Sequence, residues 1–95
     1  MRFTLSLAAE RDIRERRDYI AADDPYAADV VVGKLIKAFL LIRSNPEIGR
    51  KDPSGKYREW SVPNLSYVIP YVAGPELISI IRIYHTSRLR PSNWQ

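Results

Sequence analysis

The spacing of apolar residues changes once near the start of the chain, from about 2 to about 3.6 residues. Three apolar residues first alternate with polar ones and predict a strand with one buried face: Phe3, Leu5 and Leu7. From about Ser6 to Ala22, apolar residues at helical spacing with charged residues between them predict an amphipathic helix. Arg16 lies on the apolar side of this helix, so we expect its stem to be buried and its charge to reach the rim.

A second helix is predicted from Pro25 to about Ser44. Asp24 can cap the free amides of its first turn, Pro25 suits the first helical position, and Asn45-Pro46 ends it. Its apolar stripe is wide, so we expect this helix to pack against both the first helix and a sheet. The stripe consists of Ala28, Val31, Val32, Leu35, Ile36, Phe39, Leu40 and Ile42.

Three strands are predicted after a loop at residues 47–56: Tyr57–Val62, Tyr67–Val72 and Leu77–Tyr84. The short, turn-forming connections between them favour an antiparallel meander. The last strand is apolar on both faces, which indicates a central position in the sheet. Pro70 cannot donate to a strand ladder, so we expect its strand to have a bulge there or an outward-facing edge.

The order of these elements predicts an α+β fold: strand, helix, helix, strand, strand, strand. We expect the N-terminal strand and the helical hairpin to pack on a mostly antiparallel sheet. Ninety-five residues suit a single domain, 1–95, in which residues 89–95 form a basic, aromatic C-terminal tail.

Composition excludes several classes of protein. The chain has no cysteine and one histidine, so neither a disulfide framework nor a zinc site is expected. The four glycines form no nucleotide-binding loop, and we expect no cofactor. The start of the chain lacks the apolar stretch of a signal peptide, and no segment approaches the roughly 20 apolar residues of a membrane span. We therefore expect a cytoplasmic protein.

The late part of the chain is rich in basic residues: Arg50, Lys51, Lys56, Arg58, Arg82, Arg88 and Arg90. Aromatic residues lie between them, and basic and stacking groups on one sheet face suit a phosphate backbone with unstacked bases. The same aromatics can equally be sheet core and the charges a solvated rim. The net charge of +4, with eleven arginines and four lysines, fits either solubility or an anionic partner.

Two features near the C-terminus each have two interpretations. His85 can act as a general acid or base near neutral pH, or it can close a strand as a structural residue. The tail of residues 89–95, which includes Trp94, can dock on the body of the protein or contact a partner.

Four stretches in a fixed order carry a family resemblance from about Phe3 to Arg90: Asp18-Tyr19-Ile20-Ala21, Asn45-Pro46-Glu47-Ile48-Gly49-Arg50, Tyr67-Val68-Ile69-Pro70-Tyr71 and His85-Thr86-Ser87-Arg88. Together they resemble the RelE/ParE family of small bacterial toxins, the toxic half of type II toxin–antitoxin modules. The resemblance implies the α+β fold described above and leaves two cellular targets open.

The RelE branch of that family cleaves mRNA on the ribosome, and its third-strand motif has the form Tyr-Arg-x-x-Tyr, with the arginine on the phosphate. Here Val68 stands where that arginine would be, and an apolar side chain cannot stabilise a phosphorane. If this chain were such a nuclease, the resemblance would assign the phosphate contacts and the proton transfer to a basic set: Arg50, Lys51, Lys56, Arg58, Arg82 and His85.

The ParE-like branch is the closer resemblance, because of Val68 and the His85-x-x-Arg88 ending. It implies a protein without catalysis that binds DNA gyrase and stalls its cleaved-DNA intermediate. The residues expected to contact the target are Arg82, Arg88, Arg90 and Trp94. A degenerate toxin that is kept only to bind its antitoxin is the third interpretation.

All three interpretations imply the same partner, a cognate antitoxin whose disordered, acidic C-terminal segment folds as it wraps the toxin, with a hetero-oligomer as the expected assembly. Part of the apolar stripe on the second helix then serves as its contact surface. The residues expected there are Val31, Leu35, Phe39 and Ile42, with Arg16 of the first helix.

Overall fold

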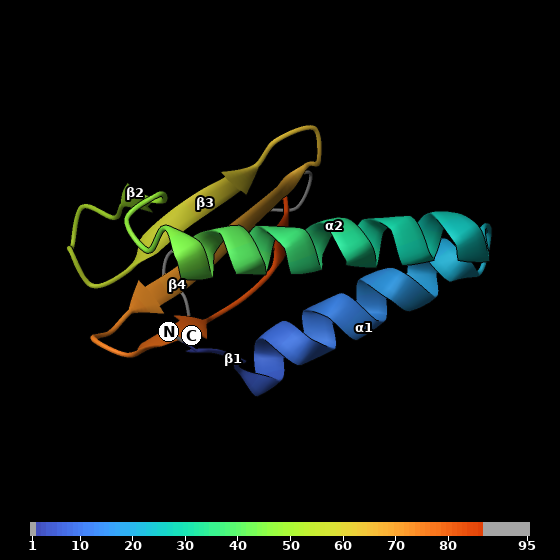
Figure 1. The fold of residues 1–95 in the computed structure, drawn as a ribbon. Helices are drawn as coiled ribbons and strands as arrows, with labels where there is room; N and C mark the ends of the chain where they lie inside the picture. Colours follow the sequence, from blue (N-terminus) through green and yellow to red (C-terminus); the bar gives the residue numbers. More distant parts are fainter. Residues whose placement is uncertain (1, 87–95) are drawn as a thin grey trace.

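The computed structural model describes residues 2–86, which form two helices and one mixed sheet (Figure 1). The helices are α1 (Leu7–Ala21) and α2 (Pro25–Ser44). The strands are β1 (Arg2–Leu5), β2 (Arg50–Lys51), β3 (Arg58–Val62), β4 (Tyr67–Ala73), β5 (Leu77–Ile80) and β6 (Tyr84–His85). The predicted α+β class and element order are therefore confirmed, with β2 and β6 as short additions.

Local capping signals set both ends of the helical hairpin. The Ser6 hydroxyl accepts a hydrogen bond from the Ala9 N–H (2.9 Å) and begins α1. Asp24 caps α2 in the same way, and the predicted bounds Pro25–Ser44 are confirmed to the residue. Leu7 was wrongly assigned to the buried face of the first strand. It lies in the first turn of α1 with 79% of its side chain exposed, because the cap ends the strand at Leu5.

The sheet has the strand order β1-β5-β4-β3-β2. Strands β3, β4 and β5 form the predicted antiparallel meander, while β1 joins it in parallel, with Arg2 opposite Leu77 and Leu5 opposite Ile80. The central position predicted for the last strand is thus confirmed for β5, which lies between β1 and β4.

The predicted strand Leu77–Tyr84 is in fact two strands, separated at residues 81–83. Ile81 N–H donates to Pro70 O (2.9 Å). The nitrogen of Pro70 faces the same neighbouring segment but has no hydrogen, so the return hydrogen bond of the ladder cannot form. Two residues separate Val68 from Tyr71 on β4, whereas three separate their partners Tyr84 and Ile80. The expected bulge is present, but the extra residue lies in the segment opposite Pro70 rather than in its own strand.

The helices cover one face of the sheet, and α2 crosses in front of β3 and β4 (Figure 1). The core forms between them from fully or nearly fully buried side chains of α1, α2, β3, β4 and β5: Ala9, Leu35, Ala38, Phe39, Ile42, Val62, Tyr67, Ile69, Tyr71, Ile78 and Ile80. The alternate residues of the strands lie on the opposite side of the sheet, which we call the far face.

Candidate functional site

Val68 lies on the far face of β4, directly opposite Ser61 of β3. Its side chain is 7% exposed and contributes to a shallow cavity of about 310 Å³. We call this the Val68 cavity; its lining is Ile48, Arg50, Glu59, Trp60, Ser61 and Val68. The cavity is where a phosphate-binding arginine of the nuclease branch would project.

The charges at the Val68 cavity compensate one another. An oxygen of the Glu59 carboxylate lies 3.6 Å from the Arg50 guanidinium, and the Glu59 side chain is only 10% exposed. A carboxylate at this position repels a phosphate group and competes for the single arginine. Together with the apolar Val68, it leaves the cavity without the uncompensated cation that phosphoryl chemistry requires.

Arg58 lies on the helix side of β3 rather than beside the Val68 cavity. It donates from Nη1 to Gly49 O (2.9 Å) and more weakly to Glu47 O (3.4 Å). Tyr71 holds the same loop, since its hydroxyl accepts from Gly49 N–H (2.9 Å) and donates to Pro46 O (2.7 Å). Burial raises the pKa of the Tyr71 phenol, ahead of the Gly49 N–H and the Arg58 charge, which lower it. Arg58 is therefore a loop-positioning residue.

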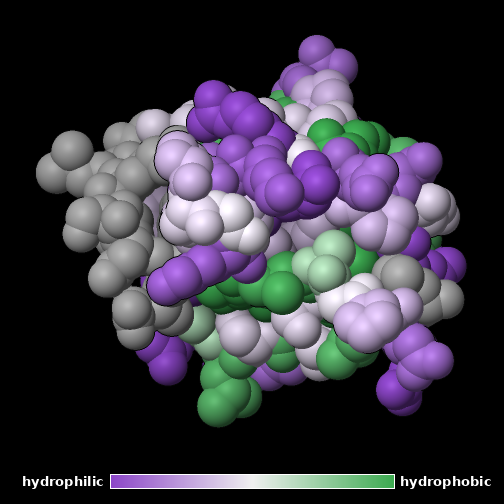
Figure 2. All heavy atoms as spheres, turned by 90° about the vertical axis from the view of Figure 1, so that its left-hand side faces the viewer, coloured by the Kyte–Doolittle hydropathy of each residue, from purple (hydrophilic) through white to green (hydrophobic). Residues whose placement is uncertain are grey.

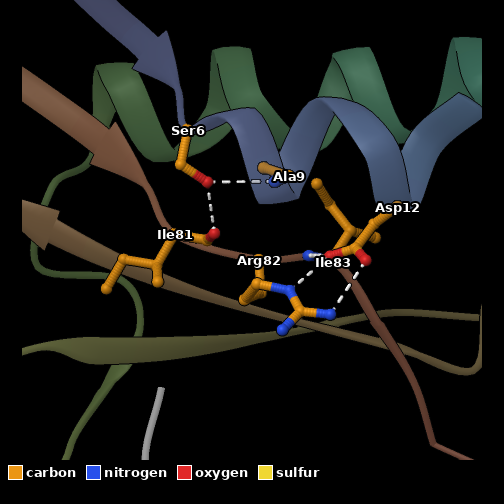
Figure 3. Close-up of polar contacts among 6 residues, drawn as sticks. All are labelled: Ser6, Ala9, Asp12, Ile81, Arg82 and Ile83. Atoms are coloured by element: carbon orange, nitrogen blue, oxygen red, sulfur yellow. Dashed lines mark hydrogen bonds and ion pairs between the residues drawn. The ribbon is translucent and has the colours of Figure 1, made fainter. Parts of the chain in front are cut away.

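Arg82 forms a bidentate ion pair with Asp12 of α1 (Figure 3). Its Nε and Nη2 lie 2.8 and 3.0 Å from the two carboxylate oxygens, and the Asp12 side chain is 9% exposed. The hydrogen bond to Asp12 raises the pKa of Arg82. Asp12 also accepts from Ile83 N–H (2.9 Å), and the Ser6 hydroxyl donates to Ile81 O (2.6 Å). The ion pair thus fastens the start of α1 to the bulged segment 81–83.

Arg82 was expected to contact a target or a phosphate, but its Nε and Nη2 donate to Asp12 in this intramolecular contact. Asp12 could not be singled out from the sequence, because a partner 70 positions away gives no local signal for the pair. Lys51 and Lys56 are exposed on the loop around β2. The residues of the basic set therefore do not converge on one pocket.

His85 lies in β6 with its ring edge-on to the ring of Tyr67, at 5.2 Å between ring centres. Arg16 donates from Nε to the Tyr67 hydroxyl (2.7 Å), and its guanidinium lies 5.1 Å from the ring centre of Tyr19. Asp12, Arg16, Tyr67, Ile83 and His85 line a crevice of only about 10 Å³. That volume holds about one water molecule and cannot admit a nucleotide.

The predicted antitoxin surface on α2 needs correction. Leu35, Phe39 and Ile42 are at most 2% exposed and belong to the core of the chain itself, while Val31 is half-buried against that core. The sheet covers this side of α2, so it offers no surface to a partner. The apolar side chains that α2 does expose lie on its other side: Val30, Ile36, Leu40 and Leu41, between 38% and 49% exposed.

A groove of about 240 Å³ lies between this exposed side of α2 and the end of β3. We call it the lysine groove; its lining is Lys34, Lys37, Ala38, Leu41, Trp60, Val62, Pro63 and Asn64. This groove was not predicted from the sequence; the signal that could have indicated it is the pair Lys34 and Lys37, one helical turn apart. In the view from the end of the molecule where β2 lies, an apolar band crosses the surface below hydrophilic side chains (Figure 2).

Three predicted contact residues, Arg88, Arg90 and Trp94, lie outside the described residues, as does the tail of residues 89–95. Within residues 2–86, no group of three or more His, Asp or Glu side chains is placed to hold a metal ion. No helix in the described part of the chain has the length and apolar character to cross a membrane.

The family of the chain follows from comparison with known proteins. Residues 3–90 match the family described as ParE toxin of type II toxin-antitoxin system, parDE. This chain belongs to the ParE toxin family, and the ParE-like branch indicated by Val68 and the His85-x-x-Arg88 ending is confirmed.

A solved structure shares the fold. It is described as a chromosomal ParDE TA system from P. aeruginosa and superposes with a TM-score of 0.77 at 19% sequence identity, covering 90% of this chain and 95% of that chain. No curated protein sequence matches the chain.

Proposed function

We propose that this chain is a toxin that arrests growth by binding DNA gyrase, without catalysing a reaction of its own, and that a cognate antitoxin neutralises it. The observation that carries the proposal is the match to the ParE toxin family over residues 3–90. The site chemistry supports it independently, because a binding protein needs no cation on a scissile phosphate.

Two local features argue against a nuclease. The Val68 cavity holds one arginine, and Glu59 pairs with it at 3.6 Å. The crevice beside His85, at about 10 Å³, has no room for a scissile nucleotide. A general acid acts only within hydrogen-bonding reach of the reacting group, so His85 suits a structural role at the end of the sheet.

Arg88, Arg90 and Trp94 remain the proposed target contacts, since arginine and tryptophan are frequent in binding hot spots. Arg82 is proposed only as a support for this surface, because its guanidinium is paired with Asp12. A gyrase inhibitor acts where the chromosome is, so the proposed location is the cytoplasm.

The direct test is gyrase supercoiling of relaxed plasmid with the purified chain titrated in, while cleaved DNA is scored on the same gels. We expect dose-dependent inhibition with trapped cleaved DNA. His85→Ala is expected to inhibit as well as the wild type, whereas Arg88→Ala with Trp94→Ala is expected to lose inhibition while remaining folded.

A chain that arrests growth but leaves gyrase unaffected at micromolar concentration would overturn the proposal. Cleavage of mRNA on ribosomes, lost in His85→Ala, would then identify the nuclease activity of the RelE branch. A chain that arrests no growth at all would be a degenerate toxin that serves only to bind antitoxin.

A further inference from the structure

The outer edge of β3 is open beyond the point where β2 pairs with it. In an antiparallel pair, every second residue turns its backbone N–H and C=O toward the same neighbour. Asp52 N–H donates to Tyr57 O (3.0 Å), so Tyr57, Glu59 and Ser61 turn these groups away from β4. Glu59 pairs with Arg50 there, but Arg50 is the first residue of β2. No strand residue precedes it to pair with Ser61.

The chain before β2 does not continue as a strand along this edge. Ile48 N–H donates to Asn45 O (2.9 Å) in the turn that follows α2. Ser61 is exposed, and no residue in the range 2–86 bonds to its outward backbone N–H or C=O. An exposed, unpaired strand edge is a template to which another extended segment can add.

Cavities lie on both sides of the Ser61 edge. The lysine groove is on the helix side, the Val68 cavity is on the far face, and Trp60 lines both. Successive side chains of a strand point to opposite faces. A segment paired with Ser61 would therefore place neighbouring side chains alternately in the two cavities, which gives such an edge sequence preference as well as hydrogen bonds.

The chemistry of the edge specifies the segment further. The floor of the lysine groove is apolar, and the exposed Lys34 and Lys37 stand at its rim. This arrangement suits a bound segment that places an apolar side chain in the groove and a carboxylate, two residues away on the same face, near the lysines. The indole N–H of Trp60 is buried without an acceptor in the described chain, an unfavourable state that a partner supplying an acceptor would relieve.

We propose that the Ser61 edge of β3 is the docking site for an acidic, extended segment of the antitoxin, which adds as a strand and anchors an apolar side chain in the lysine groove. This inference rests on the proposed function, which supplies the antitoxin as the partner. It replaces the buried stripe of Leu35, Phe39 and Ile42 with an edge to which no residue in the range 2–86 bonds.

The test uses the full toxin and the full antitoxin of the same parDE module. Ser61→Pro removes the outward N–H and leaves the β3–β4 ladder intact, because the Ser61 N–H does not point to β4. Ser61→Ala is the matched control, since it keeps the N–H. We expect Ser61→Pro to weaken antitoxin binding by about tenfold or more and Ser61→Ala to leave it unchanged.

Charge reversal gives a second, independent variant that leaves the backbone of β3 untouched. Lys34→Glu with Lys37→Glu is expected to weaken binding by about tenfold or more. Arg11→Glu with Arg14→Glu changes the net charge by the same amount on the exposed side of α1 and is expected to change binding far less.

Amide hydrogen exchange of the wild-type chain measures directly whether the Ser61 N–H is hydrogen-bonded. The Ser61 amide is expected to exchange rapidly in the free toxin and slowly in the complex. If the antitoxin binds but the Ser61 amide stays unprotected, this inference is wrong and the proposed function stands. Failure of the wild-type toxin to bind the antitoxin would overturn both. Protection in the free toxin that rises with its concentration would assign the edge to a second copy of the chain instead.

Discussion

Asp12 and Arg82 lie 70 residues apart in the chain and form a bidentate ion pair with contacts of 2.8 and 3.0 Å. The pair is mostly removed from water, with 9% of the Asp12 side chain and 26% of the Arg82 side chain exposed. Asp12 also accepts the Ile83 N–H, so one carboxylate satisfies both the guanidinium and the backbone of the bulged segment. Asp12 thereby links α1 to the end of the sheet.

Replacing Asp12 should therefore cost more than replacing an ordinary surface carboxylate. Asp12→Ala is expected to lower the free energy of unfolding by about 2–3 kcal/mol, because it leaves a partly buried cation and an N–H unpaired. Asp29→Ala is the control. Its pair with Arg17 is 3.3 Å long, its side chains are 56% and 70% exposed, and its loss should cost less than about 1 kcal/mol. Urea denaturation of both variants measures the difference, and equal losses would contradict a special role for Asp12.

The Tyr71 hydroxyl bridges Gly49 N–H and Pro46 O from a fully buried position. Tyr71→Phe keeps the ring and removes both hydrogen bonds, so we expect a loss of about 1–3 kcal/mol in the free energy of unfolding. Tyr26→Phe is the matched control, since that ring is 76% exposed, and its effect should be near zero. A Tyr71→Phe variant as stable as the wild type would mean that the loop is held by other contacts.

The same phenol makes the stability of the fold depend on pH in the alkaline range. Because burial raises the pKa of Tyr71 in the folded chain, the unfolded chain loses the phenolic proton first as the pH rises above about 10. The contribution of Tyr71 is thus complete below that pH and declines as the pH rises toward the folded-state pKa. Urea midpoints of wild type and Tyr71→Phe between neutral and alkaline pH test this. The gap between them should narrow at high pH, and a constant gap would contradict it.

Gly49 packs directly against Tyr71 and β3. A Cβ added there would lie 2.7 Å from Tyr71 Cε1 and 2.9 Å from Glu59 O, and a backbone oxygen cannot swing aside. We expect Gly49→Ala to cost about 2–3 kcal/mol, with loss of the Tyr71 hydrogen bond to Gly49.

Gly33 is the control for this prediction, because an added methyl group is expected to raise stability there instead of lowering it. It lies on the exposed side of α2 with no atom within 4 Å of an added Cβ, so Gly33→Ala should raise stability by about 0.5–1 kcal/mol. Thermal unfolding of both variants measures the contrast. Similar effects of the two substitutions would show that packing at Gly49 is looser than these distances indicate.

The parts of the fold that the sequence predicts well are those with local causes. The start of α2 is set by the capping side chain of Asp24 and by Pro25, and its end by Asn45-Pro46. Both predicted ends are confirmed. The division of the last strand has a remote cause. Pro70 interrupts a ladder whose other side is residue 81, and that register is set only when the sheet assembles.

The candidate site was harder to predict for the same reason. The helical spacing of α2 identifies two apolar sides but not which of them the sheet will cover. Leu35, Phe39 and Ile42 face the core, while Ile36, Leu40 and Leu41 remain exposed. The sequence shows which residues are basic but not which of them are free to bind a partner. Arg82 pairs with Asp12, Arg50 pairs with Glu59, and Arg58 donates to the carbonyl of Gly49.

The parallel pairing of β1 with β5 has a consequence for the synthesis of the toxin. The first four residues of the fold, Arg2–Leu5, leave the ribosome long before their partners at Leu77–Ile80. Until those residues emerge, β1 has no neighbour and the hairpin of α1 and α2 has no complete sheet to cover. A contact of such long sequence separation forms late in folding. A nascent toxin of this design therefore cannot complete its fold until nearly the whole chain has been translated.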